Sequence, residues 1–230
     1  SLHDALPILR VSAVMKSVYV KMFLGLIVTA LVAWLVAATA SSDHSFLAYL
    51  ATNRWLYWGL ALVELGLVLA ISTGLRKMSA GMATGLFFLF ALVNGLTLSL
   101  IFVVYSLPSI FKTFLICAGV FGAMSIYGYF TTRDLTRIGS FLYMALFGLI
   151  ILVIVNIFWA NSTLDWIVSF LGVAIFIGIT AWDTQTIKRM AMADPTMADG
   201  RLATLGALNL YLDFINLFLY LLRFFGSSRD

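Results

Sequence analysis

Residues 138–160 read IGSFLYMALFGLIILVIVNIFWA, a stretch long enough to cross a membrane and without one charged side chain. About 20 such residues span the hydrocarbon core of a bilayer as a helix. The whole chain has this character, because 63% of its 230 residues are hydrophobic, 10% are charged and the mean hydropathy is +1.06. A soluble domain carries roughly a quarter charged residues. The composition argues against a soluble enzyme, a nucleic-acid-binding protein or a disordered chain, and indicates an integral membrane protein.

Six further apolar runs of similar length accompany this stretch, and none alternates as a barrel strand does. Continuous runs predict helices, because a helix satisfies its backbone hydrogen bonds within one segment. Pro108 stands where a helix can begin, and Pro195 falls in a long loop. The sequence therefore predicts an all-α integral membrane protein, a seven-transmembrane helix bundle with spans at about 22–40, 55–74, 81–105, 108–130, 138–160, 164–185 and 203–224.

The charged residues predict the orientation of this bundle. With the N-terminus in the cytosol, ten of the 14 Lys and Arg residues fall on the cytosolic side, the bias that membrane proteins show. We expect a cytosolic N-terminal segment over 1–21, a transmembrane domain over 22–224 and a C-terminal tail over 225–230. Residues 1–8 (SLHDALPI) lack an initiator methionine and resemble a translated sequencing-adapter fragment more than a native start, so no functional expectation rests on them.

The motifs of common enzymes and metal sites are missing from the sequence. It contains no His pair, Walker-type loop, G-x-S-x-G elbow or H-E-x-x-H. The single cysteine, Cys117, lies in an apolar run, which excludes disulfide frameworks and cysteine-based metal sites. We therefore expect no enzyme activity, no cofactor and no nucleic-acid partner. The lipid bilayer is the expected partner, and a monomer the expected state. Small residues such as Gly119, Gly122 and Gly178 predict close packing of helices.

Three acidic residues fall at membrane depth: Glu64, Asp183 and Asp213. An ionisable group at a helix centre costs about 2.5–3.5 kcal/mol on insertion scales, so it rarely lies there without a role. Glu64 is the only glutamate of the chain and lies in the middle of the second span. A structural hydrogen bond inside the bundle and a functional role explain Glu64 equally well.

The last span carries a polar stripe. Asn209, Asp213, Asn216 and Arg223 are spaced four, three and seven residues apart, which places them on one face of a helix. Hydrogen bonds to neighbouring helices explain the two asparagines. A carboxylic acid at this depth instead indicates a function. A polar inward face also predicts that this last helix is central in the bundle.

Asp183 and Asp213 lie on consecutive, antiparallel spans. At 1.5 Å per residue their depths differ by less than about 10 Å, although Asp183 alone also fits a helix-end acid that reaches the interface. Two carboxyls in contact at low dielectric cannot both ionise cheaply, so the pair shares a proton near neutral pH and loses it as the pH rises. Deprotonated, the pair is an oxygen site for a hard cation such as Ca²⁺. Protonated, it latches the two helices together. The sequence predicts a pH-sensitive cation site that doubles as a gate.

Arg76 and Lys77 end the second span on the expected cytosolic side. A cation here can pair with the acids in a closed state, which makes Arg76 a candidate latch. The ordinary enrichment of cations on the cytosolic side explains both residues as well.

Three segments together resemble the Bax inhibitor-1 family, also called transmembrane Bax-inhibitor-motif proteins. They are LYLDFINLFLYLLRFFG (210–226), AWDTQTIK (181–188) and VNGLTLSLIF (93–102). The resemblance covers nearly the whole chain in length, span count and motif order, and the sequence looks like a bacterial member in the inner membrane. It implies a seven-helix bundle whose last helix is wrapped by the other six. It also implies a calcium leak that responds to pH through paired aspartates, which by motif match are Asp183 and Asp213.

The resemblance leaves the latch open. The family's arginine at the end of the second helix falls in GLRKMS (74–79), where an ungapped match places Leu75 rather than Arg76. Some bacterial relatives are described as modulators of a membrane-bound quality-control protease, so a membrane protease is a second candidate partner beside Ca²⁺ and protons.

Three functions follow from these observations. The first is a pH-gated calcium leak channel or a slow exchanger of similar effect. The second is a non-transporting membrane regulator that binds a protease or another membrane protein. The third is an intramembrane aspartyl protease, which the sequence disfavours because the last span lacks a Gly-x-Gly-Asp context and seven spans are too few.

Overall fold

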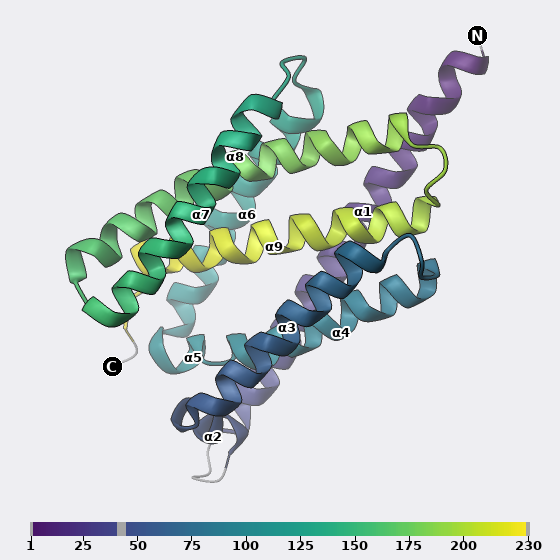
Figure 1. The fold of residues 1–230 in the computed structure, drawn as a ribbon. Coiled ribbons are helices and arrows are strands. Elements are labelled where there is room, and N and C mark those ends of the chain that lie inside the picture. The colour runs from purple at the N-terminus through teal and green to yellow at the C-terminus, as the bar shows by residue number, and fades with distance from the viewer. Residues whose placement is uncertain (1, 41–44, 229–230) are drawn as a thin grey trace. The chain divides into compact units, whose positions relative to one another are not determined.

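The computed structural model describes residues 2–40 and 45–228 of the chain. Within these residues the backbone forms helices and no β-strand (Figure 1). The helices are α1 (Leu2–Ala38), α2 (Phe46–Thr52), α3 (Arg54–Gly74), α4 (Ala80–Leu98), α5 (Ile101–Val104), α6 (Leu107–Phe130), α7 (Thr136–Trp159), α8 (Ser162–Ala193) and α9 (Asp199–Phe225).

The prediction of an all-α protein with seven membrane-spanning helices is confirmed. The described residues contain seven helical segments long and apolar enough to cross a bilayer: α1, α3, α4 together with α5, α6, α7, α8 and α9. Pro108 is the second residue of α6, and Pro195 lies in the connection between α8 and α9, as expected. The last helix is the most buried of the seven, since 67% of its apolar window is buried, compared with 6% for α3 and α7.

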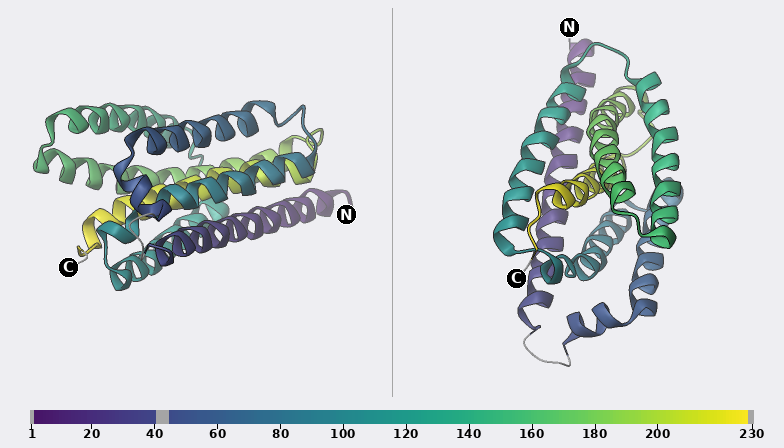
Figure 2. Two further views of the ribbon diagram at one scale, coloured as in Figure 1. Left: turned by 90° about the horizontal axis from the view of Figure 1, so that it is seen from below. Right: turned by 90° about the vertical axis from the view of Figure 1, so that its left-hand side faces the viewer.

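Two helices extend well beyond their predicted spans. Figure 2 shows α1 as one unbroken helix, and its apolar part begins at Pro7 rather than near residue 22. Val14 and Val18, inside the segment expected to precede the first span, are fully buried. At the other end of the chain, α8 continues to Ala193 instead of ending near residue 185. Hydropathy marks where a helix is apolar, not where its backbone hydrogen bonds end.

The connection after α1 and the third predicted span are also more structured than expected. The short helix α2 lies in the predicted loop and is capped by the Ser45 hydroxyl, while the Asn53 side chain caps α3. The third span divides into α4 and α5, with Ser99 and Leu100 between the two helices. At the chain ends, α9 stops at Phe225, within the predicted tail; residue 1 and residues 229–230 lie outside the described residues.

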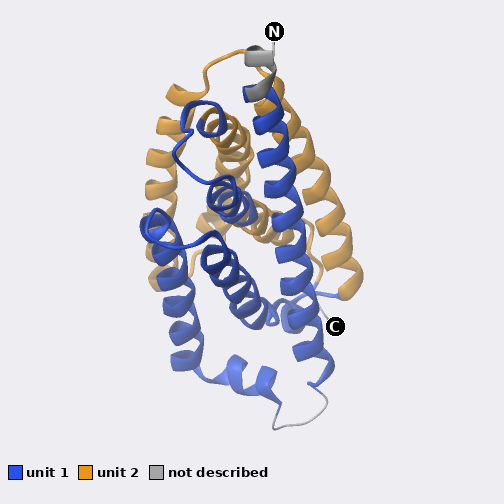
Figure 3. Cartoon of the chain, turned by 90° about the vertical axis from the view of Figure 1, so that its right-hand side faces the viewer, with its two compact units in different colours: residues 1–106, 190–211, 228–230 blue, residues 107–189, 212–227 orange. Residues whose placement is uncertain are grey.

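The chain divides into two compact units (Figure 3). Unit 1 comprises residues 1–106, 190–211 and 228–230, and unit 2 comprises residues 107–189 and 212–227. The first half of α9 therefore belongs to unit 1 and its second half to unit 2.

The core of unit 1 forms around Tyr211 of α9, whose side chain is fully buried. Its ring packs edge-on against Phe87 and Phe90 of α4. Its hydroxyl accepts a hydrogen bond from Asn94 Nδ2 at 2.8 Å and pairs with the Thr29 hydroxyl of α1. A buried tyrosine normally finds such partners for its hydroxyl. This node joins α1, α4 and α9.

The core of unit 2 is an aromatic cluster between α6 and α9. Phe214 packs against Phe114 and Phe121, with ring centroids 5.4 and 5.3 Å apart, and Phe114 also meets Phe218. Offset and edge-on ring pairs of this kind add stability beyond the area that they bury.

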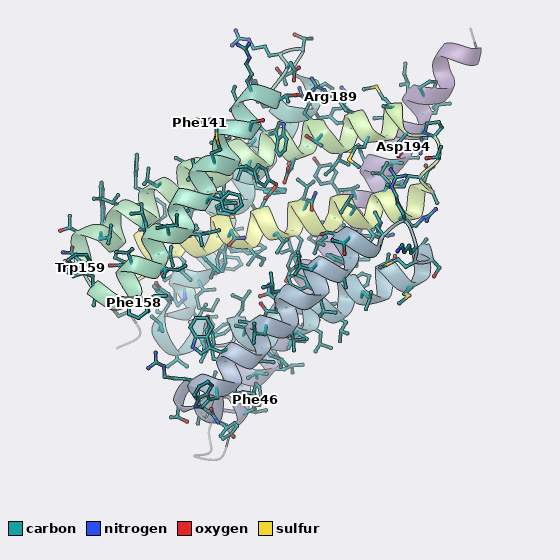
Figure 4. The ribbon with its side chains drawn as sticks, in the orientation of Figure 1. Phe46, Phe141, Phe158, Trp159, Arg189 and Asp194 are labelled. Atoms are coloured by element: carbon teal, nitrogen blue, oxygen red, sulfur yellow. The ribbon has the colours of Figure 1, made fainter. Side chains whose placement is uncertain are left out.

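The outer face of α7 is apolar and exposed, as expected for a surface in contact with lipid. Phe141, Phe158 and Trp159 are 64%, 86% and 76% exposed (Figure 4). The predicted packing role of small residues holds only in part. An alanine methyl at Gly178 would press on Leu142, whereas one at Gly119 or Gly122 would meet no atom within 4 Å.

Candidate ion site

The two aspartates expected to pair lie together in unit 2. The carboxyl groups of Asp183 of α8 and Asp213 of α9 lie close enough to interact directly, and each residue is only 4% exposed. A hydrogen bond between two carboxyl groups needs a proton on one of them, because an ionised carboxylate only accepts. Among the described residues no N–H or hydroxyl donates to Asp213 Oδ2. Asp213 Oδ2 is therefore open to a further donor or to a cation.

Two glycines let α6 and α7 approach the segment of α8 that carries Asp183. A Cβ on Gly128 of α6 would overlap the carbonyl oxygen of Ala181, and one on Gly139 of α7 would overlap the indole of Trp182. Helix α8 is thus held closely at the backbone of Ala181 and at the side chain of Trp182, the two residues before Asp183. Only glycine permits such contact, since any side chain would separate the helices.

Tyr143 of α7 completes the surroundings of the pair. Its ring meets the Trp182 indole edge-on with centroids 5.0 Å apart. Tyr143 is also near enough to interact electrostatically with both Asp183 and Asp213.

Beyond Asp183, side chains of α8 form hydrogen bonds with the turn between α6 and α7. The buried Gln185 amide donates to Arg133 O at 2.8 Å and accepts from the Leu135 N–H at 3.0 Å. One turn later, Lys188 Nζ donates to Tyr129 O at 2.7 Å and lies over the Tyr129 ring. The position of α8 is therefore fixed on both sides of the turn.

An ion pair at the surface adds to these contacts between α8 and the turn. Arg189 binds Asp134 Oδ1 at 2.8 Å and also donates to the Thr136 hydroxyl. Hydrogen bonds from Thr136, followed by the Arg189 guanidinium, lower the pKa of Asp134 to about 2. Asp134 is therefore ionised at any physiological pH. Both partners are exposed, so this pair contributes less than the buried Gln185 bonds.

On the other side of the pair, Asp213 is positioned by the residue that follows it. The Phe214 ring lies in the aromatic cluster of unit 2, and its carbonyl oxygen accepts a bond from Cys117 Sγ at 3.6 Å. These contacts fix the helix turn from which the Asp213 carboxyl projects.

The aspartate pair offers Ca²⁺ few ligands. Ca²⁺ takes six to eight oxygens, and the described residues contain no group of three or more His, Cys, Asp or Glu that could hold a metal. Asp183 and Asp213, the residues predicted as metal ligands, supply two carboxyls. The pair by itself therefore leaves most of the ligand positions of a Ca²⁺ ion to water or to other groups.

The other predicted polar residues lie elsewhere. In unit 1, Glu64 of α3 is half-buried and accepts a hydrogen bond from the Thr97 hydroxyl of α4. Arg76, the candidate latch, is exposed and lies 3.3 Å from Asp194 Oδ2 in the α8–α9 connection. In this structure Arg76 thus pairs with a loop carboxylate; its latch role stays a prediction.

The asparagines of the last helix do not all serve as expected. Asn216 Nδ2 donates to Leu212 O at 2.8 Å, within its own helix rather than to a neighbouring one. Asn209 is half-buried on the unit 1 half of α9. Arg223 is exposed and binds Asp165 of α8 at 3.3 Å, near the end of unit 2.

Sequence reasoning missed several residues around the pair: Gly128, Gly139, Tyr143 and Gln185. Gln185 lies inside the segment 181–188 that carries the resemblance, and its polarity at a helix end was a usable signal. The glycines and Tyr143 carried no such signal, because their roles depend on which helices cross there.

The family model described as "Inhibitor of apoptosis-promoting Bax1" matches residues 11–230. The chain belongs to the Bax inhibitor-1 family. It is 47% identical over 218 residues to the inner membrane protein YbhL of Escherichia coli K12, an alignment that covers 94% of this chain and 92% of YbhL. A protein of Borreliella burgdorferi is 44% identical, and the alignment covers 94% of this chain and 92% of that protein. A protein of Deinococcus radiodurans is 37% identical, and the alignment covers 96% of this chain and 93% of that protein. The family and the seven spans together make this chain a multi-pass membrane protein.

Proposed function

We propose that this protein is a pH-sensitive calcium leak channel, or a slow Ca²⁺/H⁺ exchanger, gated by the Asp183–Asp213 pair. The observation that carries the proposal is the close approach of two buried carboxyls on consecutive helices. We further propose that it works in the inner membrane of a bacterium, the location given by the name of its Escherichia coli relative.

Protons and calcium compete for the same oxygens in this proposal. With one proton the two carboxyls bind each other and hold α8 against α9. Once the proton leaves, the two negative charges repel at low dielectric and attract a divalent cation instead. Calcium binding is therefore favoured as the pH rises. Ca²⁺ and H⁺ are the transported or exchanged ions here, and no resident cofactor is required.

Purified protein in dye-loaded liposomes tests this function. Wild type should admit Ca²⁺, whereas Asp183→Asn and Asp213→Asn should change the rate, because an amide cannot lose a proton. Asp165→Asn is the matched control: it removes an exposed carboxylate of the same unit and should leave the rate unchanged. Correct folding is checked by monodispersity in detergent and by the intrinsic tryptophan fluorescence of each variant.

The same experiment separates transport from the alternative of a regulator that binds a membrane quality-control protease. Folded wild-type protein without calcium entry would contradict the transport proposal and favour the regulator, which should then be recovered from membranes in a stable complex. Peptide hydrolysis that both aspartate variants abolish would instead indicate an enzyme, contrary to our proposal.

A further inference from the structure

Small polar side chains stand at every fourth position of α6 except one and are all buried. They belong to the row Ser109, Thr113, Cys117, Phe121 and Ser125, which are 7%, 0%, 0%, 4% and 5% exposed. Residues four apart are neighbours along a helix, and each is turned by about 40° from the one before, so this row winds around α6. We call these five residues the α6 stripe. Its interruption by a phenylalanine divides it into two polar parts.

Thr113 is the exception among the buried hydroxyls of unit 2. Thr180 and Thr184 donate to the backbone of their own helix at 2.7 and 2.8 Å, and Ser109 donates to Phe225 O. Thr113 Oγ1 is fully buried and has no hydrogen-bond partner among the described residues. An unpaired buried hydroxyl costs about 1–3 kcal/mol, and the adjacent turn offers a carbonyl that would remove this cost. The Thr113 hydroxyl is therefore free in this structure to bind a ligand.

The α6 stripe runs beside the aspartate pair. Cys117 Sγ donates to the carbonyl of Phe214, the neighbour of Asp213. Ser125 Oγ accepts from the hydroxyl of Thr184, the neighbour of Asp183, at 3.5 Å. The pair thus lies alongside α6 between the levels of Cys117 and Ser125.

Phe121 lies at the same level and closes the stripe in this structure. Its ring packs edge-on against Phe214 with centroids 5.3 Å apart. On one side of this ring contact the stripe offers Cys117, Thr113 and Ser109, and on the other it offers Ser125. Apolar rings that narrow a polar route can gate it by excluding water.

We infer that ions cross unit 2 along the α6 stripe, with the Thr113 hydroxyl as an oxygen ligand on the far side of Phe121 from Ser125. The inference rests on the proposed function, because it gives a route to the ion that the aspartate pair admits. Polar groups at membrane depth line water-filled routes or pair with each other, and Thr113 has no pairing among the described residues. An ion on this route then meets the carboxyl pair, the Phe121–Phe214 ring contact and Thr113 one after another.

A pair of threonine variants tests the route in the liposome assay. Thr113→Val keeps the shape but removes the hydroxyl, so calcium entry should fall about fivefold, the scale of one lost hydrogen bond. The pH dependence should persist, because the carboxyl pair is intact, and thermal stability should be equal or higher. Thr180→Val removes an equally buried hydroxyl that is bonded to its own helix, and should leave the rate unchanged.

The outcomes distinguish a failure of the proposed route from a failure of the proposed function. Calcium entry in Thr113→Val equal to wild type would overturn the route while the proposed function stands. An equal fall in both valine variants would also overturn it, since the effect would then follow from packing. A wild type without calcium entry would end both proposals.

The single cysteine allows a second test, which does not depend on a change in side-chain packing. Cd²⁺ is close in charge and size to Ca²⁺ and binds thiols strongly. Cd²⁺ added outside the liposomes should block calcium entry through wild type and block Cys117→Ser at least about tenfold less. Equal block of the two proteins would show that Cys117, and with it the α6 stripe, lies off the route.

Discussion

Replacement of Gly128 by alanine tests whether α6 and α8 meet as described beside the aspartate pair. The new methyl group would overlap the carbonyl oxygen of Ala181, two residues before Asp183. This obstacle is backbone, so no rotamer change can remove it. The whole of α8 must move away from α6, and the Asp183 carboxyl must move with it.

The magnitude follows from two opposing effects. Alanine is favoured over glycine in a helix by about 1 kcal/mol. Overpacking a close contact costs typically 1–3 kcal/mol, and a backbone obstacle lies at the upper end of that range. We therefore expect Gly128→Ala to lose about 1–2 kcal/mol of unfolding free energy. For a chain of this size that lowers Tm by about 2–8 °C.

Gly122→Ala on the same helix is the matched control. Its methyl group would meet no atom within 4 Å, so only the helix preference acts, and Tm should rise by about 2–4 °C. Tryptophan fluorescence in detergent at one heating rate measures both variants, since membrane proteins often unfold irreversibly. A Gly128→Ala protein as stable as Gly122→Ala would refute the described contact between α6 and α8.

Three further predictions concern the contacts around this site. Asp134→Asn should lower Tm slightly near pH 7, and the difference from wild type should vanish as pH falls from about 4 toward about 2, because a lowered pKa stabilises the fold only while the carboxyl is ionised. A difference that grows in acid would contradict the ion pair with Arg189. Gln185→Leu leaves the buried Leu135 N–H and the Arg133 carbonyl of the α6–α7 turn unpaired and should cost about 1–3 kcal/mol, whereas an unchanged melting curve would show that water replaces the amide. Tyr211→Phe should cost about 1–2 kcal/mol through the loss of the hydroxyl at the core of unit 1, and retained stability would show that its two hydrogen bonds contribute nothing.

The sequence was sufficient to predict which residues pair at the candidate site. Asp183 and Asp213 are acids on consecutive antiparallel helices, and helix rise alone places them at similar depth. The helix ends were harder to predict. Helix α8 continues through residues 186–193, which carry Lys188 and Arg189, and α1 includes an apolar stretch from Pro7 that the prediction assigned to the N-terminal segment.

The side of a helix that meets each neighbour could not be predicted. Gly122 and Gly128 look alike in the sequence, yet only Gly128 meets the backbone of another helix, since the crossing point of α6 and α8 depends on both surfaces. Asn216 shows the same limit, because its amide donates to a carbonyl of its own helix rather than to a neighbouring helix.

The account depends most on the shared proton of Asp183 and Asp213, and calcium entry measured as a function of pH tests it directly. Wild type and Asp213→Asn are reconstituted at equal protein density, and initial rates are recorded in steps on both sides of neutral pH. The account predicts a wild-type rate that rises with pH and an Asp213→Asn rate that does not vary across the series. An Asp213→Asn protein that keeps the full pH dependence of wild type would contradict it.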